Sequence, residues 1–246
     1  MNAIILAAGM GTRMLPLTCD TPKPLVKVNG VPVIERQLQC LHSAGITEIY
    51  VVTGYHSGQF EYLKYRYGVN LIYNPLYAVY NNIYSLYLAR ERFNDSYIIE
   101  GDIFIRNNVF TRNISWSCYF SGFKKRIENE WVLEYDDEQF VRRIFVPRSS
   151  EGLPAACRDG ACIICGISHW TKEAAAIIRN AVMTEVERAG EDDSNIKRMF
   201  WDDMVIRHLH QLDLKINIVH SDDLFEIDTQ NDLKELETYL YVTEEK

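Results

Sequence analysis

The chain has 246 residues, of which 47% are hydrophobic and 24% are charged, so we expect one globular domain spanning residues 1–246. The formal net charge of -8 argues against a nucleic-acid partner, because binding to a phosphate backbone needs a concentrated basic surface. No segment approaches the roughly 20 apolar residues of a membrane span, and the first residues lack the basic flank of a signal peptide. We therefore expect a cytoplasmic protein without a membrane partner.

Strand and helix patterns alternate through the first part of the chain. Apolar runs predict strands at residues 3–6, 49–53, 70–73 and 97–99, and helical periodicity predicts helices at residues 33–44, 57–67 and 82–93. This alternation predicts an α/β protein with a parallel sheet and helices on both of its faces.

The pattern changes in the middle of the chain. Strands are predicted at residues 118–122, 131–135 and 140–146, and the Asp136-Asp137 pair predicts a turn between the last two, so this part should leave the parallel order. The remaining predicted elements are a strand at 161–167, helices at 172–187, 199–209 and 229–241, a charged loop at 190–195 and a strand at 215–219.

Three cysteines, Cys157, Cys162 and Cys165, have a spacing that is found in some iron–sulfur proteins. A cluster would need a fourth ligand and a loop, whereas residues 161–167 have the pattern of a buried apolar strand. We therefore interpret these cysteines as ordinary core residues.

The strongest local motif is the segment LAAGMGTR at residues 6–13, which directly follows the first predicted strand. Ligands of open α/β sheets bind at the carboxyl ends of strands, where glycines let backbone N–H groups approach phosphate closely. The segment lacks the lysine of a P-loop and the third glycine of a dinucleotide fingerprint. Arg13 in the loop and Lys23 downstream are two cations that could meet a triphosphate. The alternative is a structural turn with solvated basic residues.

Three carboxylates are candidate metal ligands. Asp102 follows the strand at residues 97–99 and should lie at the same sheet edge as the glycine loop. Glu226 and Asp228 are two residues apart, so on an extended segment both side chains face one side and could hold a hard cation beside Asp102. The alternatives are a cap for Asp102, a solvated strand residue for Glu226, and a cap on the last helix for Asp228 or Thr229.

Aromatic and acidic side chains occur together in two separated segments, which contain Glu130, Trp131, Phe200, Trp201 and Asp202. A quaternary ammonium favours such surroundings, because it gains from aromatic faces and negative charge but has no N–H group to donate. A primary ammonium could use the same acids. The alternative is that the aromatic residues near position 200 are core positions of an amphipathic helix.

The sequence LAAGMGTRMLPLTCDTPKPLVKVNG, residues 6–30, resembles the signature of the sugar-nucleotide and cytidylyl nucleotidyltransferases. The resemblance implies a Rossmann-like, mixed but mostly parallel central sheet flanked by helices. It also implies a loop that wraps the phosphates of an NTP, a Mg²⁺ ion held by Asp102, Glu226 and Asp228, and catalytic roles for Arg13, Lys23 and Asp102. The nucleotide-binding residues expected on this basis are Leu6, Ala7, Ala8, Gly9, Gly11, Thr12, Arg13 and Lys23.

Four further segments look like those of the bacterial cytidylyltransferases that use CTP and phosphocholine: YAVYNNIYSL at 77–86, NEW at 129–131, FWDDMV at 200–205 and EID at 226–228. This narrower resemblance implies that Asn82 and Ser85 contact the cytosine base. It also implies that the acceptor is bound mainly within residues 103–225, by Glu130, Trp131, Phe200, Trp201 and Asp202.

The first hypothesis for the function is transfer of CMP from CTP to phosphocholine, giving CDP-choline and pyrophosphate. The acceptor phosphate has a second pKa of about 6 and is already a nucleophile at neutral pH, so Mg²⁺-assisted in-line attack on the α-phosphorus needs no general base. The alternatives are a cytidylyltransferase for 2-aminoethylphosphonate, phosphoethanolamine or an amino-acid phosphate, a sugar-1-phosphate nucleotidyltransferase, and a noncatalytic nucleotide-binding regulator. The aromatic and acidic segments count against the sugar, and the complete charged set counts against the regulator.

Overall fold

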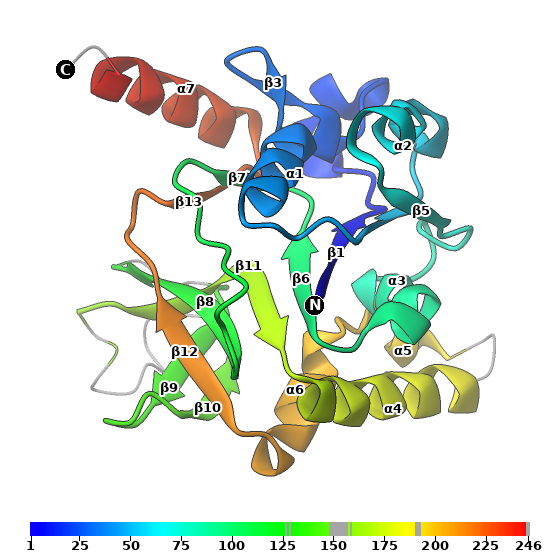
Figure 1. The fold of residues 1–246 in the computed structure, drawn as a ribbon, viewed down its shortest axis with the longest axis vertical. Helices are drawn as coiled ribbons and strands as arrows, with labels where there is room; N and C mark the ends of the chain where they lie inside the picture. The colour runs from blue at the N-terminus through cyan, green and yellow to red at the C-terminus, as the bar shows by residue number, and fades with distance from the viewer. Residues whose placement is uncertain (126, 128, 148–156, 158, 190–192, 245–246) are drawn as a thin grey trace.

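The computed structural model describes residues 1–125, 127, 129–147, 157, 159–189 and 193–244. The strands of these residues form a nine-stranded mixed sheet with helices on both faces (Figure 1). The strand order is β10-β9-β11-β6-β1-β4-β5, with β8 paired to β11 and β12 paired to β8. The predicted α/β class, a Rossmann-like central sheet flanked by helices, is confirmed.

One part of the sheet is parallel, and it contains β1 (Asn2–Ala7), β4 (Ile49–Thr53), β5 (Asn70–Tyr73) and β6 (Ser96–Glu100). Every residue of β1 is buried, as expected for a parallel strand that is covered on both faces. Parallel pairing places the carboxyl ends of β1 and β6 at one edge, with Leu6 opposite Glu100. The residues that follow these two strands therefore meet in space.

The other part of the sheet leaves the parallel order, as predicted. It contains β8 (Ser117–Lys124), β9 (Val132–Tyr135), β10 (Val141–Phe145), β11 (Ala161–Trp170) and β12 (Leu214–Ile218). Strand β11 runs antiparallel to β6, β8 and β9, and so joins the two parts. The predicted turn between β9 and β10 is present, because Asp136 Oδ1 accepts hydrogen bonds from the backbone N–H groups of Glu138 and Phe140.

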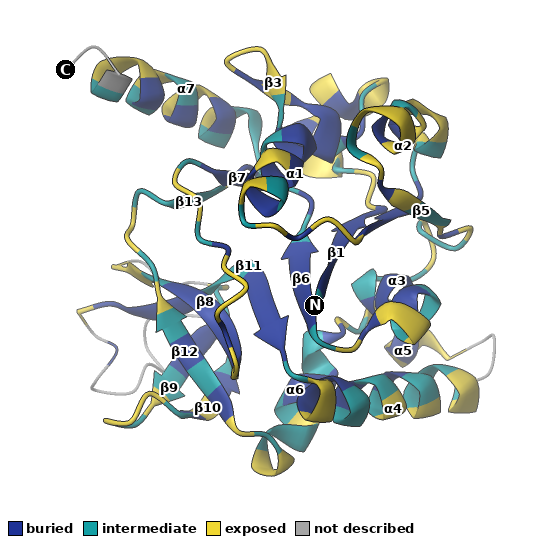
Figure 2. Cartoon of the chain, viewed as in Figure 1, coloured by how far each residue is buried: buried dark blue, intermediate teal, exposed yellow. Residues whose placement is uncertain are grey.

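Helices cover both faces of the sheet (Figure 1). Helices α1 (Val33–Ser43) and α2 (Tyr62–Tyr67) pack on one face, and α3 (Asn82–Ala89), α4 (Lys172–Arg188) and α6 (Asp202–His208) pack on the other. Successive strand residues point to opposite faces of the sheet and pack in two separate hydrophobic cores. Ile5 and Ile99 pack on the α1 side, and Leu6 and Ile98 pack on the α3 side. The central strands β1, β6 and β11 are accordingly mostly buried in Figure 2.

Two short strand pairs lie outside the main sheet. Strand β2 (Lys27–Val28) pairs with β3 (Val31–Pro32), and α7 (Gln230–Glu244) packs in a small core beside them. Strand β7 (Ile103–Ile105) pairs antiparallel with β13 (Leu224–Glu226), so that Glu226 lies opposite Ile103. These strands were not predicted, because runs of two or three residues show no periodicity.

Several predicted boundaries differ from the structure. Residues 57–67 contain a 3₁₀ turn at Ser57–Phe60 before α2, and the helix predicted from residue 199 begins at Asp202. Asp203 accepts a hydrogen bond from the backbone N–H of Phe200 at 2.8 Å, which sets this later start. Of the predicted loop at 190–195, residues 190–192 lie outside the described residues, and α5 (Ser194–Arg198) begins at its end.

Two remaining expectations concern the cysteines and the membrane. Cys162 and Cys165 lie within β11, as predicted for core cysteines, and the described residues contain no cysteine group with the spacing of metal ligands. Across the same residues, every helix is too short or too polar to cross a bilayer.

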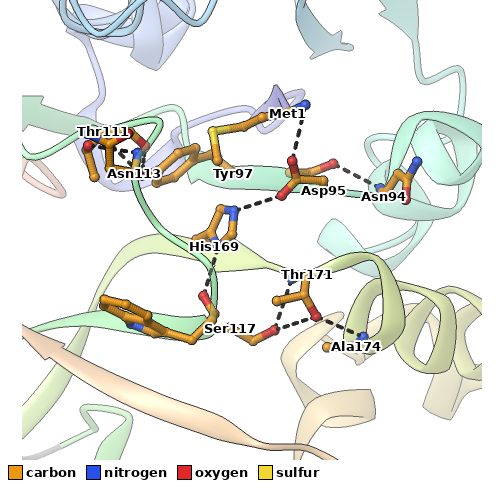
Figure 3. A network of polar contacts seen from close by, with 12 residues as sticks. Met1, Asn94, Asp95, Tyr97, Thr111, Asn113, Ser117, His169, Thr171 and Ala174 are labelled. Carbon is orange, nitrogen blue, oxygen red and sulfur yellow. Dashed lines mark hydrogen bonds and ion pairs between the residues drawn. The ribbon is translucent and has the colours of Figure 1, made fainter.

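A buried polar network joins the two parts of the sheet at the amino ends of the parallel strands (Figure 3). His169 of β11 is fully buried, with Nδ1 2.9 Å from the carbonyl oxygen of Trp116 and Nε2 3.2 Å from Asp95 Oδ1. The amino group of Met1 lies 3.2 Å from Asp95 Oδ2. This network lies at the end of β1 opposite the glycine loop, so the carboxyl ends of the strands are left to form a site.

The pairing register of β11 with β8 shifts between Ile164 and Ser168, and Gly166 lies in this bulge. Gly166 has a φ of 68°, and a Cβ there would lie 2.7 Å from side-chain carbons of buried Ile103. Gly166→Ala should therefore lower the free energy of unfolding in urea by about 1–3 kcal/mol, through backbone strain and overpacking. Gly58→Ala is the control, because a Cβ at Gly58 meets nothing within 4 Å. Equal stability of the two variants would contradict this account of the bulge.

Candidate active site

A cavity of about 590 Å³ opens at the carboxyl ends of β1 and β6. Its walls come from the glycine loop, the start of α3, the start of α6 and the middle of β11, which is less buried than the ends of that strand. The predicted site residues that line it are Leu6, Ala7, Ala8, Gly9, Gly11, Arg13, Lys23, Asn82, Ser85, Asp102, Glu130, Trp131, Phe200, Trp201, Asp202, Glu226 and Asp228. Thr12 is exposed and lies outside this lining.

The glycine loop is held in place by contacts of Gly11. This residue has a φ of 61°, and a Cβ there would lie 2.9 Å from the Cβ of Lys23. The hydroxyl group of Thr18 donates a hydrogen bond to the Gly11 carbonyl oxygen at 2.8 Å. The close approach between the loop and Lys23 therefore requires glycine at this position.

Lys23 lies between two carboxylates at the base of the loop. Its Nζ atom is 2.5 Å from Asp102 Oδ2 and 2.6 Å from Asp228 Oδ1, and Arg13 Nη1 is 2.7 Å from Asp228 Oδ2. Burial opposes the charge of Lys23, but Asp102 and Asp228 outweigh it and raise the pKa of the lysine. Burial likewise opposes ionisation of Asp228, but Lys23 and Arg13 lower the pKa of that carboxyl below its usual value. The four groups form one network of compensating charges.

Asp102, Glu226 and Asp228 form an acidic group that could hold a metal ion. Each offers a carboxylate oxygen, and these atoms lie within 4.8 Å of one another. Pairing of β13 with β7 brings Glu226 to the turn that carries Asp102, and the backbone N–H of Ile227 donates to the Asp102 carbonyl oxygen at 3.1 Å. Hard oxygen donors of this kind fit a divalent cation such as Mg²⁺.

The two later carboxylates of this group differ in their roles and surroundings. Burial of its carboxyl group, with the nearby charges of Asp102 and Asp228, raises the pKa of Glu226 to about 8, although the residue as a whole is exposed to the cavity.

The last helix is capped by Thr229 and Asp232 instead of Asp228. Asp232 Oδ2 accepts from the Thr229 N–H at 2.6 Å, and Thr229 Oγ1 accepts from the Asp232 N–H at 3.2 Å. The alternative of a capping side chain at Asp228 is therefore not supported, and its carboxylate faces the cavity.

Gln37 on α1 supports the turn that carries Asp102. Its side chain is fully buried, and Nε2 donates to the carbonyl oxygens of Glu100 at 2.9 Å and Ile103 at 2.8 Å. These two carbonyl groups flank Gly101 and Asp102, so one amide fixes both ends of the turn. The position of Gln37 on a helix far from the motifs gave no sign of this role.

The aromatic and acidic segments predicted to bind the acceptor meet in the wall of the same cavity. The rings of Trp131 and Phe200 contact edge to face with centroids 5.6 Å apart. Trp201 is only 2% exposed and packs against Trp170 and Tyr119, so it is mainly a core residue that also reaches the cavity wall. The carboxylate of Glu130 forms an ion pair with Lys124.

Two partly buried carboxyl groups, those of Asp202 and Glu100, also line the cavity. Asp202 Oδ1 accepts from the hydroxyl of Tyr119 at 2.7 Å, and burial raises the pKa of Asp202 to about 7. Burial and the nearby charges of Asp102 and Asp202 raise the pKa of Glu100 well above its usual value, against a hydrogen bond from Asn82. Both groups therefore ionise with difficulty unless a positive charge lies nearby.

Glu100 and Tyr119 were not among the predicted site residues, and neither were Asn74, Tyr77 and Tyr80, which also line the cavity. The carboxylate at the end of an apolar strand is the sequence signal that could have indicated Glu100. The predicted base contacts on α3 have partners within the protein. Asn82 Nδ2 donates to Glu100 Oε1 at 3.0 Å, and Ser85 Oγ accepts from Asn74 Nδ2 at 3.1 Å.

Comparison with known proteins agrees with this geometry. The sequence pattern of the nucleotidyl transferase family matches residues 2–114. The choline-phosphate cytidylyltransferase of Streptococcus pneumoniae is 38% identical over 98% of both chains, and that of Haemophilus influenzae is 36% identical over the whole of both. The chain belongs to the choline-phosphate cytidylyltransferase group of the nucleotidyl transferase family.

Two further relatives of this nucleotidyl transferase are informative. A solved structure of the CTP:phosphocholine cytidylyltransferase from Streptococcus pneumoniae has a TM-score of 0.88 at 38% identity, covering 97% of this chain and 98% of the other. The 2-aminoethylphosphonate cytidylyltransferase of Lancefieldella rimae is 36% identical over 94% of this chain and 90% of its own. Relatives of similar identity thus share a cytidylyl donor but differ in the acceptor that their names specify.

The contact of Gln37 with the metal-site turn can be tested in this nucleotidyl transferase. Gln37→Met keeps the size of the side chain but leaves two buried carbonyl groups without a donor, so the free energy of unfolding should fall by about 1–3 kcal/mol. Nucleotidyl transfer should fall as well, because Asp102 loses its support. Urea unfolding and pyrophosphate release measure the two effects.

The matched control is Gln39→Met, on the exposed face of the same helix. It should change both quantities little. A Gln37→Met variant as stable and active as the Gln39→Met variant would show that the turn does not depend on this amide.

Proposed function

We propose that this nucleotidyl transferase transfers CMP from CTP to phosphocholine, giving CDP-choline and pyrophosphate. The observation that carries the proposal is the shared cavity: the glycine loop with Arg13 and Lys23, the Trp131–Phe200 ring pair and Asp202 all line it. Full-length similarity to choline-phosphate cytidylyltransferases supports the same activity.

CTP is proposed to lie along the glycine loop with its base toward α3. Backbone N–H groups of the loop and the charges of Arg13 and Lys23 suit the triphosphate. The loop residues proposed to contact the nucleotide are Leu6, Ala7, Ala8, Gly9, Gly11 and Thr12. The base is proposed to lie near Asn82 and Ser85, where both side chains line the cavity.

Mg²⁺ is the proposed cofactor, and Asp102, Glu226 and Asp228 would hold it. When bound, it neutralises charge on the phosphates, as a divalent ion does in phosphoryl transfer. The protein itself supplies position and further positive charge. Lys23 and Arg13 offset the repulsion between the two anionic substrates, and the cavity walls align them.

The reaction is proposed as in-line attack by an acceptor phosphate oxygen on the α-phosphorus of CTP. A new P–O bond forms, the bond between the α-phosphorus and its bridging oxygen to the β-phosphorus breaks, and pyrophosphate leaves. The acceptor phosphate is largely dianionic at neutral pH, because its second pKa is about 6. The attacking oxygen therefore carries no proton, and no general base is needed.

The acceptor head group is proposed to lie among Glu130, Trp131, Phe200, Trp201 and Asp202, within the acceptor-binding part at residues 103–225. A trimethylammonium group near an aromatic face gains about 0.5–2 kcal/mol. Phosphoethanolamine, 2-aminoethylphosphonate and amino-acid phosphates carry a primary ammonium, which needs directed hydrogen-bond acceptors instead. We expect the enzyme to act in the cytoplasm, independently of nucleic acids and membranes.

The activity is tested by pyrophosphate release with CTP and Mg²⁺ against phosphocholine, phosphoethanolamine, 2-aminoethylphosphonate and glucose 1-phosphate. Phosphocholine should give the highest kcat/KM. Preference for a primary amine would keep the nucleotidyl mechanism and reassign the acceptor, and no release with any acceptor would point to a noncatalytic nucleotide-binding protein.

Asp102→Asn tests the metal ligand. The change keeps the shape of the side chain but removes its charge, so turnover should fall by at least about 100-fold while the circular dichroism spectrum stays unchanged. Asp213→Asn makes the same chemical change at an exposed position outside the cavity and should leave turnover intact. Near-normal activity of Asp102→Asn would contradict its assigned role as a metal ligand.

Trp131→Ala tests the acceptor end of the cavity. Loss of the indole face should raise the KM for phosphocholine several-fold more than the KM for CTP, because the ring is proposed to contact the trimethylammonium group and not the nucleotide. Trp116→Ala is the control, since Trp116 is 45% exposed and lies outside the cavity lining. An equal rise in both KM values would count against the aromatic contact.

A further inference from the structure

Glu100 is a carboxylate in a position where the strand pattern favours an aliphatic residue. It ends β6, after Tyr97, Ile98 and Ile99, which are all buried. Alternation along the strand puts Glu100 on the same face as Ile98, which is the face that packs against α3 and lines the cavity. The carboxyl group therefore points into the proposed substrate cavity instead of into solvent.

The side chain of Glu100 is fixed by one neutral partner. Asn82 Nδ2 donates to Glu100 Oε1 at 3.0 Å, while Asn82 Oδ1 accepts from the backbone N–H of Trp201 at 3.0 Å. The start of α3 is itself tied to the segment before α6, since the backbone N–H of Asn81 donates to the Lys197 carbonyl oxygen at 2.9 Å. Asn82 thus fixes the position of the Glu100 side chain relative to the segment that precedes Asp202.

A compensating cation for Glu100 is absent from the described residues. The ion pairs of these residues place Lys23 and Arg13 on Asp102 and Asp228, and Lys124 on Glu130, whereas none includes Glu100 or Asp202. Both of these acids line the cavity and are partly buried. A negative charge that is partly withdrawn from water without a partner is costly, so this part of the cavity favours a ligand that brings a positive charge.

We propose that Glu100 is a specificity-determining residue that selects the positive charge of the acceptor head group, and that Asn82 is its positioning residue. The inference rests on the proposed function and adds to it. Glu100 would recognise the charge of the head group, whereas the aromatic rings would recognise its shape. Glu100 ends the strand that leads to Asp102, where the acceptor phosphate must approach, and Asn82 joins it to Trp201, next to Asp202. We therefore place a head group that is linked to this phosphate by two carbons beside Glu100.

The chemistry of the acceptor explains why a carboxylate is needed here. A trimethylammonium group has no N–H to donate, so an uncharged hydrogen-bond acceptor recognises it poorly. The aromatic pair Trp131 and Phe200 gives both a tert-butyl group and a trimethylammonium group apolar contact, and it adds a cation–π attraction for the charged group. A fixed negative charge increases this difference further, since the two groups share size and shape and differ in one unit of charge.

The test compares phosphocholine with 3,3-dimethylbutyl phosphate, in which carbon replaces the charged nitrogen. Glu100→Gln keeps an oxygen for the Asn82 hydrogen bond and removes only the charge. We expect its kcat/KM for phosphocholine to fall by about 10-fold to 100-fold, mainly through KM, and its kcat/KM for the neutral analogue to change by less than about 3-fold. The KM for CTP should stay unchanged.

Three further variants make the result specific. Glu100→Asp, which retains the charge, should retain most of the preference for phosphocholine. Asn82→Ala should lower the same preference to a smaller degree, and it decides the test if Glu100→Gln does not fold. Because Asn82 is also a proposed contact of the cytosine base, this variant is judged by the ratio of the kcat/KM values for the two acceptors and not by the loss that both share. Glu134→Gln removes a charge from β9 outside the cavity and should leave the preference unchanged.

Loss of activity by the same factor with both acceptors in Glu100→Gln, or an unchanged ratio of the two kcat/KM values in Asn82→Ala, would overturn the inference. That result leaves the proposed function intact, because the wild-type protein would still transfer CMP to phosphocholine. Failure of the wild-type protein to use phosphocholine at all would overturn the proposed function and the inference together.

Discussion

The ammonium group of Lys23 lies between the carboxylates of Asp102 and Asp228, and the rest of the site is arranged around this contact. The contact joins the glycine loop, the turn after β6 and the segment after β13, which are far apart in the sequence. Removing one partner of a buried ion pair costs about 3–5 kcal/mol, because it leaves a charge uncompensated. An incoming triphosphate would compete for Lys23 and Arg13, and this competition would release carboxylate oxygens at the place where a divalent ion is proposed to bind.

The position of this contact follows from the change of strand direction in the sheet. Parallel strands β1 and β6 deliver the glycine loop and Asp102 to one edge, as the general rule for open α/β sheets requires. Strand β11 then enters antiparallel beside β6, and its bulge at Gly166 packs against Ile103. The later part of the chain is thereby brought to the same edge, so one cavity receives loop residues from both parts of the sheet.

Sequence patterns predicted most of the residues of the cavity but missed the contacts that hold them in place. The glycine loop, Asp102 and the Glu226–Asp228 pair were predicted because strand ends and two-residue spacing are local features. The β7–β13 pair and the amide of Gln37 were missed, because each depends on contacts between distant segments. Glu100 was missed although its place at the end of an apolar strand is a local signal, because its contact with Asn82 is not visible in the sequence. Trp201 shows the opposite case: its neighbours suggested an exposed aromatic wall, yet Trp170 and Tyr119 bury most of it. The roles proposed for these residues in binding remain predictions.

The distribution of charge along the cavity gives the site a direction. Lys23 and Arg13 provide positive charge beside the glycine loop, whereas Glu100 and Asp202 have no cationic partner among the described residues. A substrate with an anionic phosphate and a cationic head is favoured in one orientation, because reversal would place the phosphate against the uncompensated acids Glu100 and Asp202. That orientation points the phosphate at the loop where the α-phosphorus of CTP is proposed to lie. A sugar phosphate carries no positive charge, so it would leave the two acids uncompensated and gain no such alignment.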